Sequence, residues 1–256
     1  MTAKRIKVSA VSYLNSKPLI YGLEHTDIIQ EIDLSLDIPA DCANKLLTDQ
    51  VDIGLVPIAI LPKLKEYHIL TDFCIGADGP VSSVNLYSQV PMENIETILL
   101  DYQSRTSVML CRVLAKNHWK INPNWKNATT GFEAEINGST AGLIIGDRTF
   151  GKKNTYNYTF DLAEEWKKFT GLPFVFACWV ANKKLPEDFV LRFSKSIAFG
   201  IENKEFAIQE WIAKNQQQVD VREYLEKFIS YPLNVKKRTA MELFLNYCHD
   251  LESSNS

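Results

Sequence analysis

The sequence lacks the motifs that identify most metal-dependent, dinucleotide-dependent and nucleophilic enzymes. Its five cysteines are odd in number and widely scattered, and none forms a CxxC pair, so we expect reduced structural thiols. No HExxH, GxGxxG or GxSxG motif occurs. Residues 146–153 nearly match a phosphate-binding loop but lack the hydroxyl residue after the lysine that binds magnesium. The four histidines lie apart from the polar clusters described below and are poor candidates for a general base: His25, His68, His118 and His249.

An excess of charge of one sign and long apolar runs are also absent. The net charge of −3 argues against binding to nucleic acid or to a membrane surface, because both usually require a basic face. No apolar run approaches the roughly 20 residues that span a bilayer. The basic start, residues 1–9, is followed by no apolar run of signal-peptide length, so we expect a cytoplasmic protein. No pattern indicates an oligomeric state.

Apolar periodicity divides the chain into two α/β units. Strand-like runs at residues 6–10, 32–36 and 52–56 alternate with helical ones, and this βαβαβα order predicts a mainly parallel sheet. A second unit begins near residue 91, with a buried strand at 98–101 and an apolar helix over 107–118. Residues 174–180 read as a central strand, and helices follow Pro186. We predict two lobes around a cleft: a discontinuous first domain, residues 1–88 plus 175–256, and an inserted second domain, residues 89–174.

Polar residues cluster after several of the predicted strands. Ligands of open parallel sheets bind beyond the carboxyl ends of the strands, so we expect these clusters to line the cleft. The candidate binding residues are Ser12, Tyr13, Asn15, Ser82, Ser83, Ser104, Arg105, Thr106, Ser107, Gly146 and Asp147.

Residues 104–107 are the best candidate for binding an anion. Hydroxyl groups and free backbone N–H groups at a helix start donate hydrogen bonds, and the helix dipole favours negative charge there. Two alternatives remain open at this point. Ser104 either binds a ligand or simply caps the helix, and Arg105 either clamps a carboxylate or lies in solvent.

Asn15 is unusual because an amide between an apolar strand and Lys17-Pro18 has no obvious role in a core. The alternative is an Asx-turn that leads into the following helix. Ser82 and Ser83 are adjacent on a predicted strand, residues 80–86, so one faces the cleft and the other faces a protein layer.

Taken in order, these segments resemble the chorismate dehydratase family of the futalosine route to menaquinone. The motifs that carry the resemblance are residues 11–19 (VSYLNSKPL), 52–57 (DIGLVP), 82–84 (SSV), 104–107 (SRTS), 141–147 (AGLIIGD) and 164–177. The resemblance implies the two-lobed fold of type II periplasmic solute-binding proteins. It also implies a hydro-lyase that converts chorismate to 3-[(1-carboxyvinyl)oxy]benzoate without a metal or organic cofactor.

Two other functions are compatible with this fold. A 1,4-dihydroxy-6-naphthoate synthase shares it but has a different N-terminal signature and relies on a histidine in its cleft. A cytoplasmic protein that only binds small carboxylates is the other alternative.

The resemblance leaves the proton acceptor open, since Asp52, Asp101 and Asp147 are the only acids in or near the clusters. We hypothesise that the enolpyruvyl carboxylate of the substrate takes the proton while Asn15, the expected catalytic residue, holds it in place.

Overall fold

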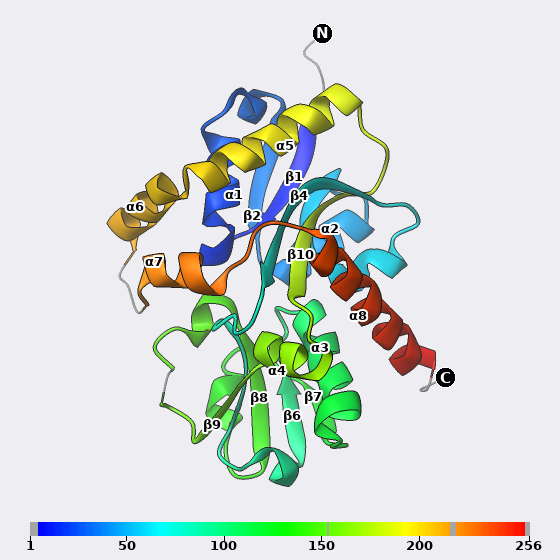
Figure 1. The fold of residues 1–256 in the computed structure, drawn as a ribbon, viewed down its shortest axis with the longest axis vertical. Coiled ribbons are helices and arrows are strands. Elements are labelled where there is room, and N and C mark those ends of the chain that lie inside the picture. Colours follow the sequence, from blue (N-terminus) through cyan, green and yellow to red (C-terminus); the bar gives the residue numbers. More distant parts are fainter. Residues whose placement is uncertain (1–4, 153, 216–218, 254–256) are drawn as a thin grey trace.

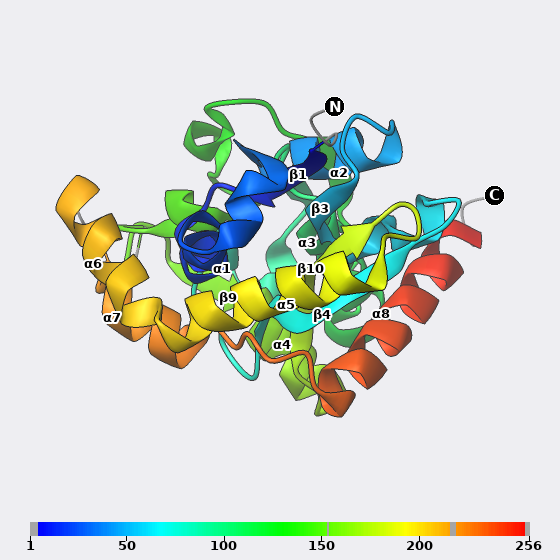
Figure 2. The same cartoon turned by 90° about the horizontal axis from the view of Figure 1, so that it is seen from above.

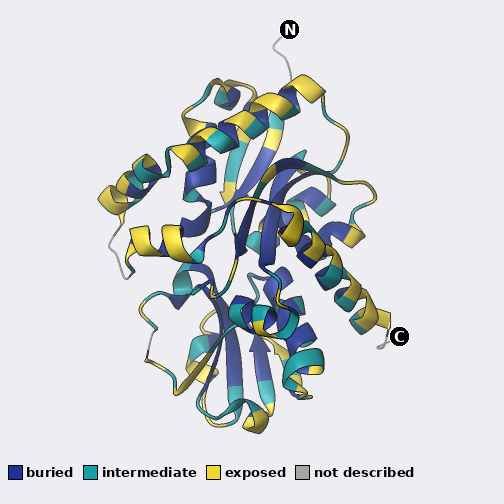
Figure 3. Cartoon of the chain, viewed as in Figure 1, coloured by how far each residue is buried: buried dark blue, intermediate teal, exposed yellow. Residues whose placement is uncertain are grey.

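The computed structural model describes residues 5–152, 154–215 and 219–253. Two five-stranded sheets form two lobes, which lie one above the other in Figure 1. The strand order is β2-β1-β3-β10-β4 in the first sheet and β7-β6-β8-β5-β9 in the second. In both lobes the central strands are largely buried, whereas the edge strands at residues 32–37, 124–127 and 158–161 have exposed residues (Figure 3).

The first sheet contains β1 (Ile6–Val11), β2 (Ile32–Asp37), β3 (Ile53–Pro57), β4 (His68–Ala77) and β10 (Phe174–Ala181). β1 pairs in parallel with β2 and β3, as predicted. β10 pairs antiparallel with both β3 and β4, so the sheet is mixed rather than mainly parallel. The difference arises because the chain returns from the second lobe and enters this sheet from the opposite end. All eight residues of β10 are buried, which confirms the prediction of a central strand.

Helices α1 (Lys17–Glu24), α2 (Pro39–Leu47), α5 (Glu187–Glu202) and α6 (Lys204–Lys214) belong to the first lobe. Figure 2 shows α1 and α5 side by side. Glycines allow their backbones to touch: a Cβ atom on Gly22 would lie 2.0 Å from the carbonyl oxygen of Ser196, and one on Gly200 would lie 2.0 Å from that of Pro18. The chain ends with α7 (Val221–Glu223), a π-helical turn (Tyr224–Phe228) and α8 (Val235–Ser253).

The second sheet contains β5 (Val84–Ser88), β6 (Thr97–Leu100), β7 (Asn124–Asn127), β8 (Thr140–Ile145) and β9 (Tyr158–Asp161). The predicted apolar helix is α3 (Thr106–Leu114), extended by a π-helical turn (Ala115–Trp119). Helix α4 (Leu162–Thr170) begins at the capping carboxylate of Asp161 and ends at Gly171, whose φ of 75° is the expected glycine cap.

The chain crosses between the lobes in the segments before β5 and before β10. The second crossing comes directly before β10, which begins at Phe174. The first comes before β5, which pairs with β8 and β9 of the second sheet, whereas the sequence assigned residues 84–88 to the first domain. The predicted strand over residues 80–86 also begins too early, since Ser82 has a left-handed φ of 64° and lies in the crossing loop. A buried apolar strand does not reveal which of two sheets it joins.

The five cysteines are free and buried, in agreement with the expected structural thiols. Within the described ranges, no helix is both long enough and apolar enough to span a membrane.

Candidate functional site

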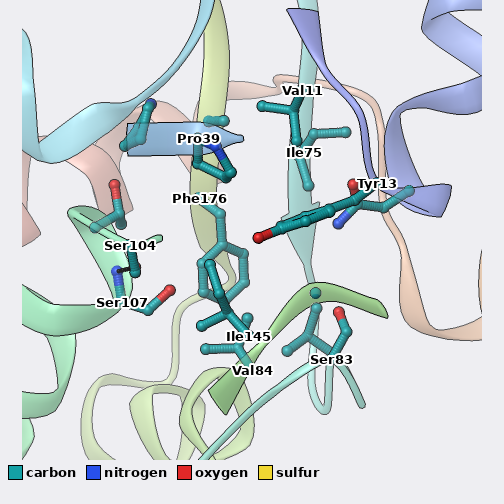
Figure 4. Close-up of a pocket in the computed structure, with 16 residues that line it drawn as sticks. Val11, Tyr13, Pro39, Ile75, Ser83, Val84, Ser104, Ser107, Ile145 and Phe176 are labelled. Carbon is teal, nitrogen blue, oxygen red and sulfur yellow. Dashed lines mark hydrogen bonds between the residues drawn. The ribbon is translucent and has the colours of Figure 1, made fainter. Parts of the chain in front are cut away.

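A cavity with a volume of about 50 Å³ lies where the two lobes meet (Figure 4). The first lobe contributes Val11, Tyr13, Asn15, Pro39, Pro57, Ile75, Phe176 and Ala177. The second lobe and the crossing before it contribute Val81, Ser83, Val84, Ser104, Thr106, Ser107, Ile145 and Gly146. Val11, Pro57 and Ile145 end β1, β3 and β8, so the cavity lies at the carboxyl ends of strands, where ligands of such sheets bind.

Seven of the candidate residues from separate parts of the sequence meet in this wall. They are Tyr13, Asn15, Ser83, Ser104, Thr106, Ser107 and Gly146. The structure therefore brings these seven residues together around one cavity.

Tyr13 crosses from the first lobe to the second. Its hydroxyl donates to the side-chain oxygen of Gln103, and its ring lies against Gly146, where a Cβ atom would be 2.4 Å from the ring (Figure 4). Gly146 also has a left-handed φ of 66°. Burial, helped by the nearby Asp101 carboxylate, raises the pKa of Tyr13 well above its ordinary value, so its phenol stays protonated.

Asn15 is buried, with 9% of its surface exposed, although it carries a polar amide. Its side-chain oxygen accepts a hydrogen bond from Ser16 Oγ at 3.2 Å, and its main-chain carbonyl accepts one from the Tyr231 hydroxyl at 2.9 Å. The described hydrogen bonds contain no backbone N–H donated to this amide, so the structure has no Asx-turn here. Asn15 lines the cavity.

Residues 104–107 occupy the N-terminal end of α3. Ser104 Oγ accepts the backbone N–H of Ser107 at 3.1 Å, so Ser104 caps the helix and lines the cavity at once. Thr106 Oγ1 accepts the backbone N–H of Ala59 across the cleft at 3.2 Å. The Ser107 side chain lies at the cavity in Figure 4. The helix dipole favours negative charge at this end of the helix.

Ser12 and Ser82 are not part of the wall. The backbone N–H of Ser12 bonds the carbonyl oxygen of Asp37 at 2.9 Å, and that of Ser82 bonds the Asp161 carboxylate at 2.6 Å. Of the adjacent serines, Ser83 faces the cavity, because the left-handed backbone at Ser82 ends the strand-like alternation there.

Arg105 and Asp147 also lie outside the wall. The Arg105 guanidinium folds onto the carbonyl oxygen of Ser104 at 3.0 Å and lines a separate groove, so its predicted place among the cavity residues is not observed. Both carboxylate oxygens of Asp147 lie 3.1 Å from the backbone N–H of Leu14, which ties the lobes together. Burial raises the pKa of Asp147 to about 6.

Several hydrogen bonds cross the cleft. Among them are the bonds from Tyr13 Oη to Gln103 Oε1, from Leu14 N to the Asp147 carboxylate, from Ala40 N to Gln103 O at 3.1 Å, and from Ala59 N to Thr106 Oγ1 at 3.2 Å. The lobes are thus held in a closed arrangement around the cavity.

Sequence reasoning missed Gln103 and Arg148, although both lie in polar clusters that it singled out. Asp101 is fully buried and accepts the backbone N–H groups of Gln103 and Ile145, each at 2.9 Å, together with the Arg148 guanidinium. Burial raises the pKa of Asp101, and the neighbouring Arg148 opposes that rise. This buried pair fixes the loop from which Gln103 reaches Tyr13. The spacing of these residues gave no sign of their pairing.

The described residues that line the cavity carry no carboxylate, imidazole, ammonium or guanidinium group. Its polar groups are neutral hydroxyls, one amide and backbone N–H groups. Within the described ranges, no group of three or more potential ligands could hold a metal ion. The arrangement can position an anionic molecule by directed hydrogen bonds, and it places no protein base in the wall.

A family model described as menaquinone biosynthesis matches residues 6–250. The chain belongs to the menaquinone biosynthesis family. It is 30% identical over 219 residues to the chorismate dehydratase of Campylobacter jejuni, covering 78% of this chain and 95% of that protein. It is 28% identical over 171 residues to the chorismate dehydratase of Thermus thermophilus, covering 58% of this chain and 61% of that relative's length.

Solved structures show the same fold for this member of the menaquinone biosynthesis family. A protein of Archaeoglobus fulgidus matches with a TM-score of 0.76 at 15% identity, over 98% of this chain and 99% of that one. The aliphatic sulphonate-binding protein SsuA of Escherichia coli matches with a TM-score of 0.59 at 10% identity, over 98% and 94% of the two chains. A Candida albicans protein described as having the generic periplasmic binding protein fold matches with a TM-score of 0.65 at 13% identity, over 94% and 90%. The predicted two-lobed, periplasmic-binding-protein-like fold is confirmed.

Proposed function

We propose that this protein is a chorismate dehydratase, a cytoplasmic hydro-lyase that converts chorismate to 3-[(1-carboxyvinyl)oxy]benzoate in menaquinone biosynthesis. The observation that carries the proposal is the closed cavity with Asn15 and the start of α3 in its wall. Membership of the menaquinone biosynthesis family and the similarity to the Campylobacter enzyme over 95% of its length support it.

The neutral wall suits a substrate that brings its own charges. Chorismate has two carboxylates, and the hydroxyls of Ser104 and Ser107 with the free N–H groups of α3 are suited to bind one of them. Val84, Ile145 and Phe176 offer apolar contact to its ring. We assign the α3 end to a carboxylate because negative charge is stabilised there.

The reaction breaks the C3–H and C4–O bonds of chorismate. The electron pair of the C3–H bond completes the aromatic ring, and the C4 hydroxyl leaves as water with one proton. The enzyme has to orient the substrate and stabilise charge that spreads into the ring carboxylate.

The enolpyruvyl carboxylate is the proposed proton acceptor. General base catalysis typically contributes about 10²–10⁴ in rate, so a wall without a base needs a replacement. Asp147 follows Gly146 of the wall in the sequence but lies outside the wall, and its oxygens accept the Leu14 N–H. Asn15 holds the enolpyruvyl group over C3, which makes the substrate its own base.

Incubation of the purified protein with chorismate tests the proposal. We expect loss of chorismate and appearance of the aromatic product, followed by ultraviolet absorbance and chromatography. Thermal stabilisation by chorismate without product would instead indicate a small-carboxylate-binding protein. Turnover of a naphthoate precursor with no reaction of chorismate would indicate the synthase that shares the fold.

A further inference from the structure

The hydroxyl of Tyr224 reaches the cavity wall from the C-terminal part of the chain. Tyr224 begins the π-helical turn after α7, which lies at the level where the lobes meet in Figure 1. Its side chain is buried, and its hydroxyl donates a hydrogen bond of 2.7 Å to Ser83 Oγ. Ser83 lines the cavity, so the C-terminal segment supports a polar group of the wall directly.

The main chain of Asn15 is held from the same segment, because the Tyr231 hydroxyl donates to its carbonyl oxygen at 2.9 Å. The C-terminal segment therefore contacts the wall both at Ser83 and at the backbone of the expected catalytic residue.

The number of hydroxyl hydrogens decides which group donates in the bond between Tyr224 and Ser83. A tyrosine hydroxyl has one hydrogen, and Tyr224 gives it to Ser83. The Ser83 hydrogen is then left for another acceptor, and Ser83 lies on the wall. The two hydroxyls form a chain from Tyr224 to Ser83, which ends in a hydrogen that Ser83 can donate into the cavity. Successive bonds in such a chain polarise one another.

Packing alone does not account for this hydroxyl. The ring of Tyr224 makes an edge contact with Phe150, with centroids 5.1 Å apart, and phenylalanine would make the same contact. A fully buried hydroxyl is unfavourable unless it is bonded. Tyr224 donates its hydroxyl hydrogen to Ser83, a polar residue of the cavity wall.

We propose that Tyr224 is a positioning residue, which turns the Ser83 hydroxyl toward the bound substrate. The inference rests on the proposed dehydratase function and adds a residue to its site. Tyr224 does not touch the reacting atoms and acts through Ser83.

Steady-state kinetics of Tyr224→Phe, Ser83→Ala and the double variant test this role with chorismate as substrate. Loss of one neutral hydrogen bond corresponds to about a 3- to 10-fold fall in kcat/KM for Tyr224→Phe. In the Ser83→Ala background the same change should cost less than about twofold, because the chain is already broken. The matched control is Tyr87→Phe, which removes another buried hydroxyl that bonds Asn85 at 3.1 Å away from the cavity. The control should leave kcat/KM within about twofold.

The inference would be overturned if Tyr224→Phe lowered kcat/KM equally with Ser83 present and in the Ser83→Ala background. It would also be overturned if Tyr87→Phe lowered kcat/KM as much as Tyr224→Phe does. Either result would show that Tyr224 acts through stability alone. Unchanged kcat/KM in Tyr224→Phe would do the same while leaving the proposed function intact. Absence of chorismate turnover in the wild-type protein would overturn both. If Tyr224→Phe does not fold, 3-fluorotyrosine at position 224 keeps the packing and strengthens the donor. It should then change kcat/KM when Ser83 is present and leave it unchanged in Ser83→Ala.

Discussion

Replacing Gly146 by alanine should prevent the lobes from closing. A Cβ atom at this position would lie 2.4 Å from the Tyr13 ring, and contacts below 3.0 Å force a displacement. The ring cannot move aside easily, because the Tyr13 hydroxyl bonds Gln103 of the opposite lobe. The added methyl group therefore acts on closure and not only on the backbone at Gly146.

The magnitude has two separable parts. The φ of 66° disfavours alanine by about 1–2 kcal/mol, which for a chain of this size lowers the unfolding temperature by roughly 2–8 °C. The steric part shifts the Tyr13 segment, and with it Asn15, by several tenths of an ångström or more. Since misplacement of catalytic groups by about 1 Å can cost about 10²-fold, we expect kcat/KM for chorismate to fall by about that factor.

Gly138→Ala is the matched control. Gly138 has a similar φ of 55° in the second lobe, and a Cβ atom there would meet no atom within 4 Å. It should share the loss in unfolding temperature and keep its kcat/KM. Adding Tyr13→Ala to Gly146→Ala should restore the compact radius of gyration in small-angle scattering, since the clash is gone. Equal kinetic losses in the two glycine variants would refute the reasoning.

Three further predictions concern the other residues of the site. Asn15→Ala should lower kcat by about 10²–10⁴ in product-formation assays while circular dichroism shows an unchanged fold, because substrate orientation is lost; a fall matched by unfolding would instead assign Asn15 a structural role. Asp147→Asn should keep much of the turnover. In the wild-type protein, folding raises the pKa of Asp147 to about 6, so the native state keeps a proton that the unfolded state loses above about pH 4, and the wild type loses stability as pH rises from about 4 to about 7. The variant has no such group, so its unfolding temperature relative to wild type should increase over this pH range. A constant difference between the two unfolding temperatures would contradict this. Ser107→Ala should raise KM by about 2- to 10-fold, and Arg105→Ala, whose guanidinium lies outside the cavity, should change it by less than about twofold; the reverse order would return Arg105 to the site.

Local pattern was sufficient for much of the fold. Alternation and apolar runs identified β1, β3 and β10, and Gly171 marked the end of α4, since periodicity and caps depend on neighbouring residues. The sheet membership of β5 and the antiparallel pairing of β10 were not accessible, because each depends on partners far away in the sequence.

In the site, too, local sequence pattern predicted some features, and others depend on residues far apart in the sequence. Seven candidates meet at the cavity because strand ends converge in such a fold. Arg105 and Ser104 are neighbours in one motif, yet Ser104 lines the cavity and Arg105 does not, because spacing cannot decide the direction of a side chain at an irregular helix start. Tyr224 lies 141 residues from Ser83, in a segment whose pattern indicates only a core helix.

The contact between α1 and α5 gives the site a dependence on a distant helix. Asn15 lies immediately before α1, and α1 cannot slide or rotate while Gly22 and Gly200 hold its backbone against α5. Any side chain at either glycine would push α1 outward and carry Asn15 with it. Random variants can be selected in cells that must make the pathway product themselves in order to grow. In such a library Gly22 and Gly200 should tolerate as few substitutions as the residues of the cavity, although neither glycine lines it.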